Sequence, residues 1–375
     1  MTGQFPGGQP AGTDLLPGAD RTDLLPGADR ADLLPGRRTV RTRRFSFAVH
    51  RRSVAVTVTL MVLLAVAVTL SLSIGSTYVA PLDVLRALFD GDGPAAVIVN
   101  VLRLPRVAAG ILAGAALGMA GALFQTVARN PLASPDVLGV TYGASAGAVT
   151  VIVLGLGAMS VPMAAGLGGA AAAIAVYLLA WRSGLHAGRF VVVGVALSFA
   201  LNRFTDLMLA QDEVIAAQQA RVWLTGTLNG RGWSHLAPLV VVLVVSAPLL
   251  LWAPRGMRVS QLPDDVGVGV GARLGLIRLA LIGLGVAYAA AATSAVGPVE
   301  FVALASPQLA ARLTRSGAPG LLASALVGAL MVAVADVIAR TVFTPYELPV
   351  GVVTAVLGAP YLLWLLARAR VGGSG

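Results

Sequence analysis

Few side chains in this sequence could carry covalent or metal chemistry, and none of them form a known motif. The 375-residue chain has no cysteine and no lysine, and its three histidines, His50, His186 and His235, are far apart. The lack of cysteine excludes disulfides, thiolate metal sites and cysteine nucleophiles. The lack of lysine excludes the Gly-x-x-x-x-Gly-Lys-[Ser/Thr] loop that binds phosphate in ATPases. We therefore expect no catalytic residue, no metal site and no cofactor.

The polar chemistry that remains lies inside apolar segments. Asn202, Arg203 and Asp206 stand in one such segment, and the i, i+3 spacing of Arg203 and Asp206 lets them pair on one helix face. At the centre of a membrane helix each charge costs about 2.5–3.5 kcal/mol on insertion scales. Two interpretations follow: a structural ion pair buried against another helix, or a polar wall of a translocation path. Glu300 poses the same choice, since it can pair with an arginine or line a cavity.

The elements that must position these residues are membrane spans. The chain is 57% hydrophobic and only 12% charged, and a transmembrane helix needs about 20 mainly apolar residues. The sequence predicts an all-α, polytopic integral membrane protein with about ten transmembrane helices in a domain over residues 53–370. The candidate spans are residues 54–74, 107–128, 142–158, 161–181, 190–211, 236–253, 275–296, 298–312, 319–343 and 349–367.

The first 52 residues form a separate compositional region. A nine-residue unit that contains Asp-Leu-Leu-Pro-Gly repeats from Thr13 and again from Thr22, and a basic stretch follows at residues 37–44. Regular Pro and Gly with little apolar area predict a disordered tail. Arginines stand beside the first span and in the loops that follow the second, fourth, sixth and eighth spans. This distribution predicts that both termini are cytoplasmic, with residues 371–375 as a C-terminal tail. We expect the basic charge to contact membrane lipid rather than nucleic acid.

Two turns between spans are irregular. Asn130 and Pro131 open a turn with two prolines, which must be buried in protein or face water because lipid cannot satisfy free backbone groups. We expect this turn to order the ends of spans two and three. Glu347 precedes the last span and Pro349 stands in its first turn, where they would cap that helix. The alternative for Glu347 is contact with a substrate.

A set of ordered motifs gives the chain a family resemblance. They are Arg103-Leu104-Pro105-Arg106, Gly114 to Gly118, Gly121 to Gln125, Asn130 to Ala133, Leu138-Gly139, Gly297 to Val302, Ala335-Asp336, and Glu347 to Thr354. Over about residues 55–368 the chain resembles the FecCD family, the permease subunits of bacterial ABC importers for iron–siderophore, haem and vitamin B12.

The resemblance implies a vitamin B12 permease-like fold and a place in the cell inner membrane. The chain would be the permease subunit of an ATP-driven importer, with ferric siderophores as the expected substrate. The path would lie between two permease subunits, as a homodimer or heterodimer. Cytoplasmic ABC ATPase subunits would hydrolyse ATP, so this chain would not be an enzyme. An extracytoplasmic binding protein would deliver the substrate.

The resemblance also assigns roles to residues. Arg103, Arg106 and Arg340 match arginines that meet glutamates of the binding protein; the alternative is snorkelling to lipid headgroups. Span five, which carries Asn202, Arg203 and Asp206, lines the path in relatives. Relatives also place two short helices in the loop over residues 254–274, which docks the ATPase. The matching coupling segment is Gln261, Leu262, Pro263, Asp264, Asp265, Val266 and Gly267.

This chain departs from the family pattern at several positions. Its coupling loop has three glycines, Gly267, Gly269 and Gly271, each of which costs about 1 kcal/mol in a helix. The alternative to a docking loop is therefore a plain flexible connection. Glu300 stands where relatives have a small residue, and Gln308 where they have histidine. These differences leave substrate specificity open.

Two other functional classes remain as alternatives. An ion-coupled secondary transporter of a small polar solute would have inverted repeats, broken helices and charges near the midplane, and Arg203, Asp206 and Glu300 give it some support. A membrane-embedded enzyme would need converging nucleophile, base or metal ligands, which the sequence lacks.

Overall fold

The structure is a computed structural model that describes residues 37–42, 45–75, 77–90, 94–157, 159–181, 187–210, 214–343 and 346–371. The chain divides into two compact units, Met1–Val54 and Ala55–Gly375. In the first unit, β1 (Arg37–Thr42) and β2 (Phe45–His50) pair as an antiparallel hairpin with Arg37 opposite His50. The sequence predicted a disordered tail over this stretch and did not anticipate the hairpin. The nine-residue repeats lie outside the described residues.

The second unit is built from helices, which confirms the predicted all-α fold of the membrane domain. Its helices are α1 (Arg51–Ser73, which begins at the end of the first unit), α2 (Pro81–Asp90), α3 (Pro94–Ala96), α4 (Leu104–Ala128), α5 (Val140–Val153), α6 (Val161–Trp181), α7 (Ala187–Ala210), α8 (Val214–Leu224), α9 (Trp233–Val245), α10 (Ala247–Ser260), α11 (Asp264–Gly269), α12 (Leu274–Val296), α13 (Val302–Thr314), α14 (Leu321–Thr341) and α15 (Val350–Val371). A π-helical segment, η1 (Val97–Arg103), leads into α4, and a short 3₁₀ turn, η2 (Pro135–Leu138), precedes α5.

Each of the ten predicted spans contains a helix, but the helices differ in length. Among the described residues, six helices are long and apolar enough to cross a membrane. The predicted span over residues 236–253 is instead a broken pair, α9 and α10, bent by 57°. Pro248, the second residue of α10, cannot donate a backbone hydrogen bond, which explains the break. The helix α5 is a shorter apolar helix of 14 residues, and α13 has only 13 residues.

The helices α4 and α14 approach each other closely in the centre of the unit. A β-carbon built on Gly114 would lie 2.4 Å from the carbonyl oxygen of Gly328, and one on Gly118 would lie 2.2 Å from that of Ser324. Small residues therefore let these two backbones touch. The same contact joins α5 to α6, where a β-carbon on Gly143 would lie 2.4 Å from the oxygen of Gly168.

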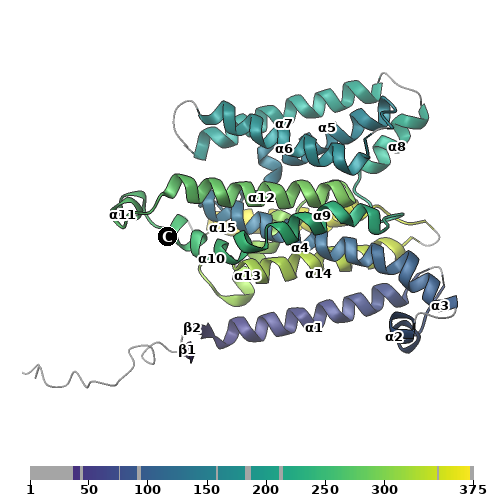
Figure 1. Cartoon of the computed structure of the whole chain (residues 1–375), viewed down its shortest axis with the longest axis horizontal. Helices are drawn as coiled ribbons and strands as arrows, with labels where there is room; N and C mark the ends of the chain where they lie inside the picture. The colour runs from purple at the N-terminus through teal and green to yellow at the C-terminus, as the bar shows by residue number, and fades with distance from the viewer. Residues whose placement is uncertain are drawn as a thin grey trace, which may run out of the picture. The chain divides into compact units, whose positions relative to one another are not determined.

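Figure 1 shows how the second unit is layered. The helices α5 to α8 gather on one side, α1 lies on the opposite side, and α4, α9, α12 and α14 lie between them. Two ends of this unit contain clusters of paired charged residues. The Arg106 end contains the C-terminus of α1, the start of α4, the end of α14 and the start of α15. The Asp264 end contains the end of α4, the helix α11 and the start of α12.

Candidate functional site

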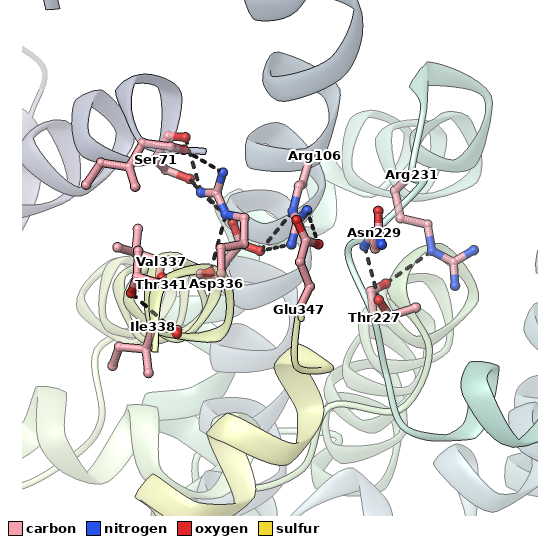
Figure 2. Close-up of polar contacts among 12 residues, drawn as sticks. Ser71, Arg106, Thr227, Asn229, Arg231, Asp336, Val337, Ile338, Thr341 and Glu347 are labelled. Carbon is pink, nitrogen blue, oxygen red and sulfur yellow. Dashed lines mark hydrogen bonds and ion pairs between the residues drawn. The ribbon is translucent and has the colours of Figure 1, made fainter. Parts of the chain in front are cut away.

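The Arg106 end is organised around one buried carboxylate, that of Asp336 on α14. Arg106 at the start of α4 donates from Nε to Asp336 Oδ1 at 3.0 Å, and its Nη2 lies 3.0 Å from the same oxygen. The Nη1 atom of Arg106 donates to Glu347 Oε2 at 2.8 Å. Figure 2 shows Arg106 between the two acids. Charge-assisted hydrogen bonds of this forked kind are the strong ones, so α4, α14 and the turn before α15 are joined at this point.

Arg340 completes the network from the other side of Asp336. Its Nη2 lies 2.9 Å from Asp336 Oδ2, and both side chains are almost fully buried. This confirms that the i, i+4 spacing brings Asp336 and Arg340 together. Arg340 also donates to the carbonyl oxygens of Ile74 and Ser71, each at 3.1 Å, and to the Ser71 hydroxyl. The guanidinium therefore satisfies carbonyls at the C-terminus of α1, which have no partner within that helix.

Arg103 has a similar place one turn before Arg106. It is buried, and its Nη1 donates to the carbonyl oxygens of Leu72 at 2.6 Å and Ser73 at 3.0 Å, while Nη2 donates to that of Thr77. Arg103 and Arg340 thus both hold the C-terminal end of α1. Of the three arginines predicted to meet a partner, Arg106 is the one whose acid partner Glu347 has a substantially exposed side chain, at 38%.

The turn before α15 is built differently from the expectation. The Glu347 carboxylate pairs with Arg106 rather than with the N–H groups at the start of α15. Pro349 directly precedes the first helical residue, Val350, and its carbonyl accepts the N–H of Val352 at 3.2 Å. Glu347 and Pro349 therefore shape the turn, but Glu347 does so through α4.

The turn after α4 is fixed by local hydrogen bonds. Arg129 takes a left-handed conformation with φ of 49° and ends α4. The Asn130 side chain then accepts the N–H of Leu132 at 2.9 Å, and the carbonyl of Pro131 accepts a hydrogen bond from the Gln308 side chain on α13. Gly139, with φ of 73°, starts α5. The proline-rich turn is thus held against protein, as expected for irregular backbone in a membrane protein.

The predicted coupling segment forms the Asp264 end. The chain turns at Gln261 and Leu262, and Pro263 precedes the short helix α11, which contains Asp264, Asp265, Val266 and Gly267. The Asp264 carboxylate lies 2.6 Å from Arg278 on α12 and 3.0 Å from Arg129 at the end of α4. The hydrogen bond from Arg278, with that from Arg129, lowers the pKa of Asp264. The loop is therefore tied to two long helices.

Two of the three loop glycines have a structural reason. A β-carbon on Gly267 would lie 2.7 Å from a methyl group of Leu274, and Gly271 has φ of +75°, a conformation that favours glycine. Gly269 has open space around it. Val266, Val268 and Val270 expose most or about half of their surface, so this end presents apolar side chains to its surroundings.

The third set of predicted residues lies on α7. The Nη1 atom of Arg203 lies 3.0 Å from Asp206 Oδ2, which confirms the i, i+3 pair, but the two side chains are 74% and 53% exposed. The pair is therefore not buried against another helix of this chain. Phe199 and Leu207 are exposed on the same helix. Glu300 is also exposed, in a tight turn between Gly297 (φ 81°) and Phe301 (φ 64°).

The structure brings together residues that sequence reasoning did not connect. Arg129 and Arg278 were not linked to Asp264, and Ser71 was not linked to Arg340. These partners lie 135, 14 and 269 positions apart. Only the short i, i+3 and i, i+4 spacings signalled their partners in the sequence, because a helix brings such residues together without any knowledge of the fold.

Comparisons with known proteins agree on one family. The model of the FecCD transport family matches residues 63–368. The achromobactin transport system permease protein CbrC of Dickeya dadantii (strain 3937) is 43% identical over 302 residues, which cover 79% of this chain and 86% of the relative. The ferric enterobactin transport system permease protein FepG of Escherichia coli (strain K12) is 38% identical over 300 residues, covering 78% and 90%.

A solved structure supports the fold. A metal-chelate type ABC transporter in an inward-facing conformation superposes with a TM-score of 0.71 at 24% identity, covering 84% of this chain and 99% of that one. At that identity the likeness concerns the arrangement of the helices.

Proposed function

This chain belongs to the FecCD transport family, and we propose that it is the membrane-spanning permease subunit of an ATP-driven importer of ferric siderophores. The match of the family model over residues 63–368 carries this assignment. The substrate class is supported by the relatives, which are described as transport permeases for achromobactin and ferric enterobactin. The chelate would cross already wrapped around its iron, so the permease would need no metal ligands of its own.

The proposal assigns a side of the membrane to each end. The Arg106 end would face outward and the Asp264 end the cytoplasm, with both termini cytoplasmic. The arginine distribution in the sequence supports this orientation. The loops assigned to the cytoplasm contain eight arginines and the outer segments six; the eight are Arg129, Arg182, Arg189, Arg255, Arg258, Arg273, Arg312 and Arg315. The chain would perform no ATP hydrolysis itself, and separate ABC ATPase subunits would supply the energy.

An extracytoplasmic binding protein would dock at the Arg106 end. Arg103, Arg106 and Arg340 remain the family-based candidates for this contact. Their geometry favours a division of roles, in which Arg103 and Arg340 fix the end of α1 and Arg106 is nearest to a partner's carboxylate. Arg106→Glu should weaken stimulation of ATP hydrolysis by the binding protein, and full stimulation in that variant would argue against the role.

The ATPase would dock at α11 and the loop around it. The Asp264 contacts with Arg129 and Arg278 support this role, because a docking loop must be fixed to the spans if motion is to reach them. The segment from Gln261 to Gly267 would then transmit nucleotide-driven motion to α4 and α12.

The exposed face of α7 would line the translocation path. An ion pair exposed to lipid is costly, so Arg203 and Asp206, with Asn202 beside them, need water or protein around them. A second permease subunit, identical or related, would provide this environment by packing around a shared water-filled path. The rest of the outer surface would contact membrane lipid.

Gene deletion tests the transport assignment. Cells that lack this gene should lose growth on ferric siderophores as the sole iron source, and the intact gene should restore it. Haem and cobalamin serve as the comparison substrates, tested by growth and by uptake. Unchanged use of all three substrate classes in the deletion strain would contradict the importer assignment.

Reconstitution tests the energy source. The broken helix pair α9 and α10 and the charged face of α7 are features that an ion-coupled transporter would also have. Liposomes that contain this chain alone, with an imposed proton or sodium gradient, should accumulate no ferric chelate. Accumulation there would favour the ion-coupled alternative, whereas accumulation only after addition of ATPase and ATP supports the importer.

A further inference from the structure

Arg231 lies near the Arg106 end and differs from Arg103, Arg106 and Arg340 in that its only polar partner among the described residues is one carbonyl oxygen. It lies in the loop between α8 and α9, and its Nε donates to the carbonyl oxygen of Thr227 at 3.2 Å. Its two Nη groups make no hydrogen bond or ion pair with the described residues. By contrast, Arg106 and Arg340 bind carboxylates, Arg103 binds three carbonyls, and the exposed Arg86 pairs with Asp83 at 3.3 Å.

The loop that carries Arg231 packs against α4 and α14, one helical turn from Arg106 and Asp336. Leu228 is buried, and a β-carbon on Gly110 would lie 3.0 Å from its methyl group and 3.4 Å from that of Val332. Gly110 is one turn beyond Arg106 on α4, and Val332 is one turn before Asp336 on α14. The backbone N–H of Arg231 donates to the carbonyl of Leu228 at 3.3 Å, and Figure 2 shows Arg231 in the same region as Glu347.

The loop has a fixed shape. Gly226 and Gly230 both have positive φ, of 66° and 69°. The N–H of Thr227 donates to the carbonyl of Val296 at 2.9 Å, and the carbonyl of Gly226 accepts the N–H of Gly351 at 3.0 Å. The α8–α9 loop is therefore anchored to the end of α12 and the start of α15. This anchoring fixes the backbone from which the Arg231 side chain extends.

A half-buried guanidinium without a carboxylate has an energetic reason to bind one. Burial lowers the pKa of Arg231, and no acid among the described residues counteracts this effect. A charge that is partly removed from water is stabilised when it is paired and hydrogen-bonded. The two free Nη groups present the fork that matches a carboxylate. At Arg106 and Arg340 the fold supplies such a carboxylate from within the chain, whereas at Arg231 the described residues supply none.

We propose that Arg231 is a docking residue that receives a carboxylate from an acidic surface of the extracytoplasmic binding protein. This inference rests on the proposed function. Arg231 would act beside Arg106, whose fork is already filled by Asp336 and Glu347 in the structure. Arg221 is exposed on the last turn of α8 and has no polar partner among the described residues. Its positive charge would speed the encounter with the binding protein rather than hold the complex together.

The complete transporter in nanodiscs, with its ATPases and its binding protein loaded with ferric siderophore, tests the proposal. Arg231→Glu should weaken binding-protein affinity at least tenfold, mainly through faster dissociation, and reduce stimulated ATP hydrolysis in parallel. Arg231→Lys should retain part of the affinity, because it keeps the charge but loses the fork. The matched control is Arg86→Glu, the same charge reversal at the same end on a residue already paired with Asp83, and it should bind as the wild type does.

The possible outcomes distinguish failure of the proposed function from failure of the role of Arg231. If the wild-type transporter binds no such protein and shows no stimulation, the proposed function fails. If the wild type is stimulated and Arg231→Glu binds with unchanged affinity, the proposed function stands and the role of Arg231 is overturned. If Arg231→Glu does not assemble, Arg231→Ala replaces it, and the slope of log Kd against log salt should be shallower than in the wild type. An unchanged slope would also overturn the role.

Discussion

Asp336 pairs with two arginines through one carboxylate, so its loss would remove an acid partner from both at once. Arg106 and Arg340 each approach a different oxygen of Asp336, and the carboxylate is 3% exposed. Both guanidinium groups are buried or nearly so. The arrangement depends on the acid, because the carbonyls and Glu347 cannot balance both positive charges.

Replacing Asp336 by Asn should therefore destabilise the fold strongly. Removing one partner from a buried ion pair costs about 3–5 kcal/mol, because it leaves an uncompensated charge. The expected result is a marked fall in the apparent unfolding temperature in detergent. Asp83→Asn removes an exposed partner of Arg86 and should change stability by less than about 0.5 kcal/mol. Equal effects of the two substitutions would show that the network contributes no special stability.

Asp264 provides a pH-dependent contact at the other end. Arg278 and Arg129 lower its pKa in the folded protein. A lowered pKa means that the contact stabilises the loop at pH values above the unfolded pKa of about 3.9, and that this contribution is lost as the pH falls through the folded value. The loop should stay fixed from neutral pH down to about pH 4 and loosen below that.

The loosening can be followed with an environment-sensitive fluorophore on Val268→Cys, since the chain has no other cysteine. The emission of the labelled protein should change in acid, below about pH 4. In Asp264→Asn the transition should be absent, because the pairing carboxylate is already missing. Asp265→Asn is the control, since Asp265 is exposed and makes no ion pair with described residues, and its transition should match that of the parent. A transition that persists without Asp264 would assign it to another group.

At the scale of the elements, glycine positions decide how the central helices pack. Gly114, Gly118 and Gly121 on α4 all face backbone atoms of α13 or α14, and a β-carbon on Gly121 would lie 1.7 Å from the carbonyl oxygen of Ala303. The neighbouring atoms are backbone rather than flexible side chains. A methyl group can therefore be accepted only if whole helices separate.

Gly118→Ala should lower stability although alanine is the better helix former. Overpacking of this kind costs about 1–3 kcal/mol, which exceeds the gain of about 0.5–1 kcal/mol from replacing glycine in a helix. Gly283→Ala on α12 is the matched control, because a β-carbon at that position would have no described atom within 4 Å outside its own helix backbone. That substitution should be neutral or stabilising. The comparison uses apparent unfolding temperatures, and a stable Gly118→Ala variant would contradict the close contact.

The positions of most helices could be predicted from the sequence, because an apolar stretch of sufficient length has few other stable forms in a membrane. The break between α9 and α10 was missed, although Pro248 signals it, since the apolar run continues across it. The roles of the arginines could not be predicted in the same way. Arg103 meets carbonyls 30 and 31 positions away, and only the fold brings the end of α1 beside α4.

At the scale of the whole molecule, two helix pairs with touching backbones bracket α12. The pair α4 and α14 and the pair α5 and α6 each have glycine–carbonyl contacts. The helix α12 meets α4 through contacts such as Gly285 with the Phe124 ring, and α6 through Ala290 with Gly169. Side-chain contacts can slide and repack, whereas touching backbones cannot, so relative motion should occur along α12.

Pairs of spin labels can test this division in the assembled transporter. A pair at Leu102 and Leu322 measures the distance from η1, which continues into α4, to α14. A pair at Leu167 and Leu322 measures the distance from α6 to α14. All three side chains are exposed. On ATP binding, the first distance distribution should stay constant while the second shifts. Variation of the first distance with nucleotide would show that α4 and α14 do not move as one body.

The glycine–carbonyl contacts also bear on how this chain could acquire a new cargo during evolution. At Gly114, Gly118 and Gly121 every other amino acid collides with a neighbouring main chain, so these positions are closed to gradual change. The exposed face of α7 and the Glu300 turn have no such restriction, because their side chains project away from the packed interior. Descendants that diverge in the chelate they carry should therefore vary first at these open positions, over an interior inherited almost unaltered.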